Sequence, residues 1–369
     1  MGQTLAEGAC ARPTMPADRE RFVQLVQGTL TDHLHRNVGI NVDSWDETVT
    51  CHRSYSTISF LQCRTSQGLR RFVAKTTAPH AENRPVNEEA NQAVVEFNIL
   101  STLYPRFAEF EATSIPEPVL VLPELNTYVM NYVSGEPLAN LLRHDRWFAS
   151  RKEFSRLELH FRRAGLWLKR FQELTGHRAG GPEVLAGIRE RCDFRLTLIE
   201  SFRDPRISAD LRKKVLRFLN EQERRLGNTP VGLTGRHVDF GPWNVLARPD
   251  GVTVLDFFGY RDDPPVMDLL SMLIALDREK KCLTANRLRV QSLQDSFLAG
   301  YGLLPRIQEP LWLMCESLQR ICGVHDALNQ NHGYLLRRLE RHRSLRSNLR
   351  WLTGDRRETL LPGGEKCQS

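Results

Sequence analysis

The feature that most constrains this chain is residues 236–258, where oxygen-bearing side chains lie among short apolar runs. Asp239 and Asn244 flank a Phe-Gly-Pro-Trp loop, and Asp256 directly follows an apolar run. Two short β-branched runs lie on either side of an Arg-Pro-Asp-Gly turn at residues 248–251, a pattern that predicts a β-hairpin. A hairpin would return the chain beside itself, so we expect Asp256 to lie near Asn244 and Asp239.

These three side chains are of the kind that phosphoryl transfer from a nucleotide requires. A divalent metal on the β- and γ-phosphates is held by hard oxygen ligands. A carboxylate must also orient the attacking hydroxyl and accept its proton. The residues alone leave a second interpretation open, a polar turn without chemistry, because Asp and Asn favour turns in any protein.

The segment resembles a motif of the aminoglycoside phosphotransferase/choline kinase superfamily. The pattern H-x-D-x-x-x-x-N, followed by a hydrophobic residue, Asp and an aromatic residue, is matched at His237, Asp239, Asn244 and Asp256. The resemblance, which covers roughly residues 45–300, implies an α+β, bilobal protein-kinase-like fold. Its N-lobe is a small antiparallel β-sheet with one helix, and its larger C-lobe is mainly helical. It further implies that Asp239 is the catalytic base and that Asn244 and Asp256 hold magnesium.

The first part of the chain has the pattern of an antiparallel sheet, because short β-branched runs are separated by tight turns. The loop at residues 53–56 lacks the Gly-rich G-x-G-x-x-G of protein kinases, so glycines do not predict a phosphate cradle there. Ser54 and Ser56 could offer donors to a phosphate, and a plain hairpin turn explains the loop equally well. The expected strands are residues 48–51, 57–63 and 71–75.

Lys75 lies at the end of the third expected strand. An ammonium there could neutralise the α- and β-phosphates of a nucleotide, and it would need an anionic partner. The apolar stripe of residues 87–104 predicts a helix that carries Glu88, Glu89 and Glu96. Glu96 best matches the E-x-x-x-L pattern of the family, so we interpret it as the partner of Lys75. The alternative is an unrelated Lys and Glu on the surface.

An apolar strand at residues 126–130 runs into a polar, Gly-containing segment at residues 131–138, which fits a linker between two lobes. The resemblance implies that Met130 precedes the linker and that backbone groups from Asn131 to Val133 contact the adenine edge. An ordinary edge strand that ends in a turn is the alternative.

Length and composition set the limits of this interpretation. A chain of 369 residues with 41% hydrophobic and 26% charged residues is typical of a soluble protein of two lobes or domains. Its longest apolar run is far shorter than the roughly 20 residues that span a bilayer. The eight cysteines show no C-x-x-C spacing, which favours a reduced, cytoplasmic protein. The expected domains are residues 1–40 (tail and helix), 41–130 (nucleotide-binding N-lobe) and 131–369 (catalytic and substrate-binding C-lobe).

The last expected helix, residues 335–352, is unusually basic. Its leucines recur at helical spacing and arginines fill many of the other positions, in a chain of net charge +7. Two interpretations stay open: a packed helix with a solvated basic face, or a surface that contacts an anionic surface or a phosphorylated ligand.

The sequence therefore predicts an ATP-dependent phosphotransferase that uses Mg²⁺ and moves the γ-phosphate to a hydroxyl of a small molecule. An aminoglycoside, a sugar, a choline-like compound or a nucleoside is a possible acceptor. A protein or lipid kinase and a non-catalytic nucleotide-binding scaffold are the alternatives. We expect Asp268 to be structural, capping a helix or bonding the catalytic loop. The acidic side chains that could contribute to a pocket for a polycationic acceptor are Asp262, Asp263, Glu316 and Asp326.

Overall fold

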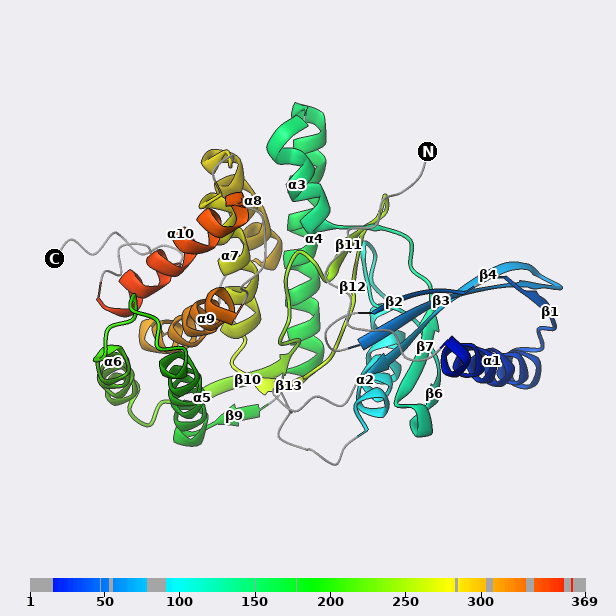
Figure 1. The fold of residues 1–369 in the computed structure, drawn as a ribbon, viewed down its shortest axis with the longest axis horizontal. Helices are drawn as coiled ribbons and strands as arrows, with labels where there is room; N and C mark the ends of the chain where they lie inside the picture. Colours follow the sequence, from blue (N-terminus) through cyan, green and yellow to red (C-terminus); the bar gives the residue numbers. More distant parts are fainter. Residues whose placement is uncertain are drawn as a thin grey trace. The chain divides into compact units, whose positions relative to one another are not determined.

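The computed structural model describes residues 16–46, 48–52, 56–77, 91–148, 150–176, 178–282, 285–302, 308–329, 335–354 and 360 (Figure 1). The chain divides into two compact units. The first comprises Met1–Ser134 and Thr253–Phe258, and the second comprises Gly135–Val252 and Gly259–Ser369. Residues 53–55 of the expected phosphate loop, and also Glu88 and Glu89, lie outside the described residues.

The first unit is built on an antiparallel sheet. Its strands follow the order β1-β3-β4-β7-β6, and β2 pairs with β3. The three strands expected from the sequence are present as β2, β3 and β4. Strand β1 was not predicted, because its Val-Asp-Ser-Trp sequence lacks a β-branched run. The strands are β1 (Val42–Trp45), β2 (Val49–His52), β3 (Ser56–Thr65), β4 (Gly68–Thr77), β6 (Pro118–Leu122) and β7 (Thr127–Asn131).

The period of two in strand β4 sends its side chains to two different layers. Phe72 and Ala74 belong to a buried apolar cluster together with Val26 and Leu30 of helix α1 (Pro16–His33). Lys75 lies on the opposite face of the strand. That face meets helix α2 (Gln92–Phe107), which carries Glu96.

Helix α2 presents a carboxylate within its apolar stripe. Asn91 caps the helix by accepting a hydrogen bond from the backbone N–H of Val94 at 3.2 Å. The buried positions recur at spacings of three and four, and Glu96 occupies one of them with no exposed surface. Burial of a carboxylate is costly unless it is paired, so the helix requires a cation at this position. The buried positions are Ala93, Glu96, Leu100, Leu103 and Phe107.

The second unit is mainly helical, and the α+β class predicted from the sequence is confirmed. Strand β10 (Val231–Arg236) pairs antiparallel with β9 (Arg178–Gly180) and β13 (Arg261–Asp263). None of the described helices is both long and apolar enough to cross a membrane. The helices are α3 (Leu138–Phe148), α4 (Arg151–Thr175), α5 (Pro182–Ser201), α6 (Leu211–Leu226), α7 (Val266–Lys280), α8 (Arg287–Tyr301), α9 (Glu309–Asn329) and α10 (Leu335–Leu352).

Helices α4 and α8 approach so closely that glycine is required at their contact. A Cβ atom on Gly165 of α4 would lie 2.7 Å from the backbone N of Tyr301 and would clash with the carbonyl oxygen of Phe297. A Cβ atom on Gly300 of α8 would clash with the carbonyl oxygen of Arg162. This contact fixes α4, whose buried aromatic side chains support the loop described next.

The turn of the expected hairpin is present. Strand β11 (Val245–Ala247) ends at a turn in which the N–H of Arg248 donates to the carbonyl of Gly251 at 2.9 Å. Strand β12 (Val252–Val254) follows and leads to Asp256.

Candidate active site

Lys75 and Glu96 form a buried ion pair in the first unit. The Nζ atom of Lys75 donates to both carboxylate oxygens of Glu96, at 3.0 and 2.7 Å. The two residues are 4% and 0% exposed. The pairing inferred from the sequence is therefore present in the structure, and its function in nucleotide binding stays a prediction.

Asp256 belongs to the same cluster, although it is 181 positions from Lys75 in the chain. The Nζ atom of Lys75 donates to Asp256 Oδ1 at 2.7 Å, and the Asp256 side chain is one-third exposed. The backbone of Asp256 has φ +70°, a left-handed conformation that is uncommon outside glycine. Burial lowers the pKa of Lys75, but the charges of Glu96 and Asp256 outweigh it and hold that pKa above its ordinary value. The ammonium is therefore charged and fixed in position between two carboxylates.

Tyr128 completes this cluster, and sequence reasoning missed it. Its hydroxyl donates to Glu96 Oε2 at 3.1 Å. Burial, together with the neighbouring Glu96, raises the pKa of Tyr128 well above 10, so the hydroxyl stays a donor. Lys75 and Tyr128 are direct partners in the register of strands β4 and β7. That register is the signal that could have identified Tyr128.

The expected hinge residues follow directly on strand β7. Met130 is buried, at 8% exposed. The N–H of Asn131 donates to the carbonyl of Glu117 at 2.9 Å, and that of Tyr132 donates to the carbonyl of Arg71 at 3.0 Å. Within the described residues, the N–H of Val133 has no backbone acceptor. Val133 is therefore the first position in this segment whose N–H is available to a ligand.

Asp239 and Asn244 lie together in the loop that follows strand β10. Asp239 is exposed, and its Oδ2 atom accepts hydrogen bonds from Trp243 Nε1 at 3.0 Å and from Asn244 Nδ2 at 2.9 Å. Asn244 Nδ2 also donates to the backbone carbonyl of Asp239 at 2.9 Å. These bonds fix the orientation of an exposed carboxylate, which is what a general base needs.

The amide of Asn244 is suited to a metal. Its nitrogen is used by Asp239, and its Oδ1 atom accepts no hydrogen bond within the described residues. Oxygen atoms of this type, together with a carboxylate such as Asp256, are the ligands that Mg²⁺ prefers, with phosphates and water completing its shell. No group of three or more His, Cys, Asp or Glu in the described part of the chain is arranged to hold a metal. The magnesium site therefore stays a prediction.

The backbone just before Asp239 is strained. Val238 has φ +75°, which is a genuine outlier for a β-branched residue. Asp268 of helix α7 secures this conformation, because it accepts hydrogen bonds from the N–H groups of His237 at 2.7 Å and Val238 at 3.2 Å. Burial raises the pKa of Asp268 to about 6. The structural function expected for Asp268, bonding the loop, is confirmed.

Aromatic side chains from helix α4 support the same loop. Trp167 stacks on Phe171 at 5.0 Å and on Phe240 at 5.5 Å between ring centroids, and it meets the edge of His237 at 6.2 Å. Trp167, Phe171, His237 and Phe240 have no exposed surface. The loop is thus anchored on its inner side, which leaves Asp239 directed to solvent.

Two of the acidic residues considered for an acceptor pocket have other functions, so that expectation was wrong for them. Asp263 is 3% exposed and accepts hydrogen bonds from Arg191 at 2.6 Å, Arg236 at 2.7 Å and Arg261 at 3.1 Å. Burial alone would raise the pKa of Asp263, but these guanidinium groups hold it far below its ordinary range. Glu316 is fully buried and accepts hydrogen bonds from Arg320 at 2.7 and 2.9 Å.

A comparison with protein-family models identifies the chain. The model described as "Phosphotransferase enzyme family" matches residues 58–310. The chain belongs to the phosphotransferase enzyme family. This match covers both the Lys75 cluster and the Asp239 loop, and it confirms the resemblance stated from the sequence. No curated protein matches the chain in a sequence comparison.

Solved structures of kinases share the fold of this phosphotransferase family member. Choline kinase LicA from Streptococcus pneumoniae has a TM-score of 0.53 at 13% identity, covering 89% of this chain and 99% of that one. Amicoumacin kinase hAmiN, in complex with AMP-PNP, Ca²⁺ and Ami, has a TM-score of 0.53 at 11% identity, with coverages of 92% and 96%. A glucosamine kinase in complex with glucosamine, ADP and inorganic phosphate has a TM-score of 0.48 at 14% identity, with coverages of 84% and 93%. For the two structures with TM-scores of 0.53, the likeness at these identities concerns the fold alone.

Proposed function

We propose that this protein transfers the γ-phosphate of ATP to a hydroxyl of a small molecule and uses Mg²⁺ to do so. The observation that carries the proposal is the position of Lys75, buried between Glu96 and Asp256. Removing these charges from water is costly, and well-packed apolar residues would be at least as stabilising. Charged groups buried in this way, with specific partners, are candidates for a functional site. Membership of the phosphotransferase enzyme family supports the same conclusion.

Each predicted site residue has a proposed function. Asp239 orients the acceptor hydroxyl and takes up its proton, which its exposed and hydrogen-bonded carboxylate favours. Lys75, positioned by Glu96, contacts the α- and β-phosphates. Asn244 and Asp256 would hold magnesium, which neutralises charge on the phosphates when bound. The adenine edge contacts the backbone from Asn131 to Val133, next to Met130.

The acceptor is proposed only as a class: an alcohol on a small molecule, such as an aminoglycoside, a sugar, a choline-like compound or a nucleoside. The two solved structures with TM-scores of 0.53 are a choline kinase and an amicoumacin kinase. Two buried carboxylates, Asp263 and Glu316, already have arginine partners, which argues against a pocket for a polycation built on them. We propose a cytoplasmic location, which the free cysteines among the described residues support.

The test compares Asp239→Asn with a matched control, Asp250→Asn. Asp250 is an exposed aspartate whose hydrogen bonds to Arg248 are local. A thermal-shift titration with ATP and Mg²⁺ comes first, followed by an ATP-consumption screen of hydroxyl compounds. We expect Asp239→Asn to bind nucleotide like the wild type and to lose turnover by about 10²- to 10⁴-fold, the usual contribution of a general base. Asp250→Asn should keep its activity.

A third variant, Asp256→Asn, should weaken the binding of ATP with magnesium. Turnover by Asp239→Asn at the wild-type rate would overturn the assignment of the base. A wild-type protein that no nucleotide stabilises would overturn the whole proposal.

A further inference from the structure

The positive charge of this chain is concentrated in two segments of the second unit. Residues 203–225 and 335–352 together contain fourteen Lys and Arg against five Asp and Glu, whereas the whole chain has a net charge of only +7. The rest of the chain is therefore slightly acidic. A local excess of this size creates a positive field that attracts anions. The two segments meet where Arg206 Nη1 lies 3.3 Å from His342 Nδ1.

A groove lies between these segments, and we call it the basic groove. Its volume is about 320 Å³, and it is lined by residues 206–211 and by helix α10. The lining combines exposed cations with buried leucines, of which Leu211 and Leu345 are both 2% exposed. All of its charged lining groups within the described residues are cationic: Arg206, Arg346 and Arg350, beside His342.

Two of these cations are available to a ligand. Arg346 and Arg350 are exposed, lie one turn apart on α10, and make no ion pair or hydrogen bond through their side chains within the described residues. Arg206 is held in place by Asp204, to which it donates at 2.8 Å. Two unpaired guanidinium groups beside an oriented third could bind one anion from two sides.

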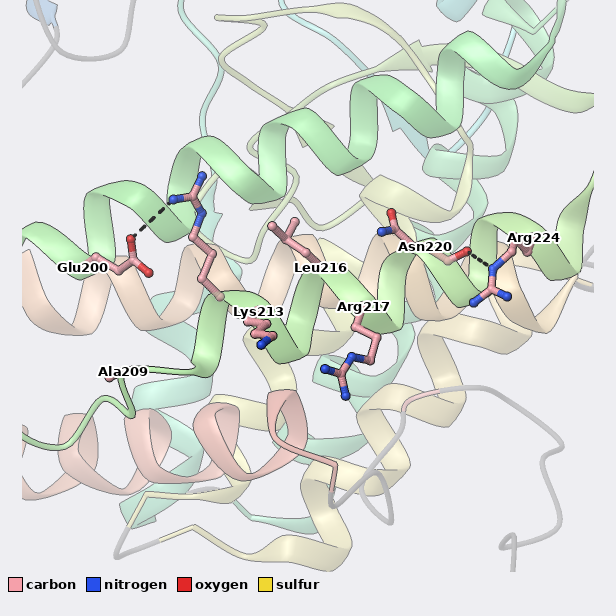
Figure 2. Close-up of a pocket in the computed structure, with 8 residues that line it drawn as sticks. Glu200, Ala209, Lys213, Leu216, Arg217, Asn220 and Arg224 are labelled. Carbon is pink, nitrogen blue, oxygen red and sulfur yellow. Dashed lines mark hydrogen bonds and ion pairs between the residues drawn. The ribbon is translucent and has the colours of Figure 1, made fainter.

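A second groove, on the α5 side of helix α6, makes a useful comparison (Figure 2). It is larger, at about 610 Å³, and it is also lined by basic residues. However, Glu200 lines it, and Arg212 lies 3.7 Å from Glu200 and 2.7 Å from Asp193. Arg224 pairs with Glu221 at 2.5 Å. Two of its four lining cations are thus paired and its lining includes a carboxylate, whereas the described lining of the basic groove has one paired cation of three and no carboxylate. The basic groove is therefore the better site for an anion.

We propose that the basic groove binds the phosphomonoester group of a ligand with an apolar body. A phosphomonoester carries a charge of about −1.5 to −2 at pH 7 and three acceptor oxygens. The planar, forked guanidinium of arginine matches that geometry. Leu349, a partly exposed leucine of the lining, would contact the apolar body. The ligand is either a free phosphomonoester or the headgroup of a lipid such as phosphatidic acid. This site goes beyond the proposed phosphotransferase reaction and does not depend on it.

The test uses the full chain and phenyl phosphate, which joins a phosphomonoester to an apolar ring. Binding is measured by calorimetry with saturating ADP and Mg²⁺, so that a nucleotide site does not compete. The variant Arg346→Gln/Arg350→Gln should lower the affinity by at least about tenfold, the effect of losing charge-assisted hydrogen bonds. The matched control is Arg338→Gln/Arg343→Gln, which removes the same charge from exposed positions of the same helix outside the groove. It should change the affinity less than about twofold, because screening weakens distant charges.

A further variant places a carboxylate in the groove without removing a cation. In Ser208→Asp the new carboxylate lies at an exposed position outside helix α6 and replaces the hydroxyl that donates to Asp210. Because the position is exposed, we expect a folded protein that no longer binds phenyl phosphate. The catalytic variant Asp239→Asn should bind phenyl phosphate like the wild type. That result separates failure of the groove from failure of the proposed reaction.

Vesicles distinguish the two sources of the ligand. A lipid is supported if the wild type binds vesicles that contain phosphatidic acid but not vesicles of pure phosphatidylcholine, and if Arg346→Gln/Arg350→Gln abolishes that binding. Binding of phenyl phosphate without vesicle binding supports a free ligand. The proposal is overturned if the wild type binds neither probe. It is also overturned if Arg346→Gln/Arg350→Gln and the control Arg338→Gln/Arg343→Gln weaken binding equally. The surface would then attract any polyanion.

Discussion

The ion pair of Lys75 and Glu96 gives a prediction whose size follows from the contacts. Glu96→Gln preserves the volume of the side chain but turns one acceptor of the Lys75 ammonium into a donor. Removing one partner of a buried ion pair costs about 3–5 kcal/mol. Asp256 still accepts from Lys75 at 2.7 Å and is one-third exposed, so it compensates in part. We therefore expect a loss of about 3 kcal/mol in the free energy of unfolding of the first unit.

The reverse variant, Lys75→Met, should cost less, because the remaining group can become neutral. Burial raises the pKa of Glu96 even in the presence of Lys75, and without Lys75 the carboxyl can take up a proton and remain bonded to Tyr128. We expect a loss of about 2 kcal/mol at pH 7. The double variant removes the pair as a whole, so it should cost clearly less than the two single losses together. The coupling energy is expected to be about 2–3 kcal/mol, the upper part of the range for contacting residues.

The measurement is a double-mutant cycle that follows the first unit directly. Hydrogen exchange of the amides of β4 and α2 reports the free energy of opening of this unit, and urea unfolding provides a second probe. Losses that add to within about 0.5 kcal/mol, as they do for distant and independent sites, would refute the reasoning. The buried ammonium and carboxylate would then not stabilise each other.

Three further predictions concern the second unit. The pKa of Asp268 is raised to about 6 by burial, so its ionisation weakens the fold as pH rises from about 4 to 6. Relative to Asp268→Asn, the wild type should gain about 2 kcal/mol of unfolding free energy between pH 7 and pH 4.5. Asp263, whose pKa is lowered by its arginines, should show the opposite sign: the advantage of the wild type over Asp263→Asn shrinks as pH falls. The free energy of unfolding is measured by urea unfolding at several pH values. If it changes with pH equally in the wild type and in each variant, both assignments are contradicted. Gly165→Ala should cost about 3 kcal/mol by overpacking α4 against α8, whereas Gly187→Ala, whose Cβ meets no atom within 4 Å, should be neutral or stabilising by up to about 1 kcal/mol. A thermal unfolding scan that ranks the two glycine variants equally would contradict the packing argument.

Local patterns predicted the strand and the helix that carry Lys75 and Glu96, and the E-x-x-x-L pattern of the family selected Glu96 among the three glutamates of that helix. Lys75 follows the apolar run Phe-Val-Ala of strand β4, and the buried positions of α2 include Glu96 but no other carboxylate in its described part. A charged residue in an apolar stripe is a local signal of pairing. Tyr128 gave no such signal, because its function depends on the register between two strands that are far apart in the sequence. The magnesium ligands were inferred from a motif, and they stay a prediction.

The residues around the Asp239 loop were harder to predict because their partners are distant in sequence. Asp263 accepts hydrogen bonds from arginines of three separate elements, whereas the sequence indicated it only as one of four acidic residues that could contribute to an acceptor pocket. Trp167 is one of several apolar residues of helix α4, and nothing in the local sequence shows that its ring stacks on Phe240. Tertiary packing decides such contacts, so a single sequence gives their residue types but not their partners.

Two residues with positive φ, Asn126 and Val238, differ in what favours their conformation. Asn126 has a positive φ of +44°, but its side chain donates to the carbonyl of Thr77 and accepts from the N–H of Ala93, and Asn tolerates this region. Val238 has φ +75° with a β-branched side chain, so nothing in its own chemistry favours that conformation. The cost, of order 1–3 kcal/mol, is met by buried groups that bond and pack the loop, above all Asp268. The strained conformation of Val238 costs stability and adds none. It lies directly before the exposed carboxylate of Asp239, whose orientation it helps to fix.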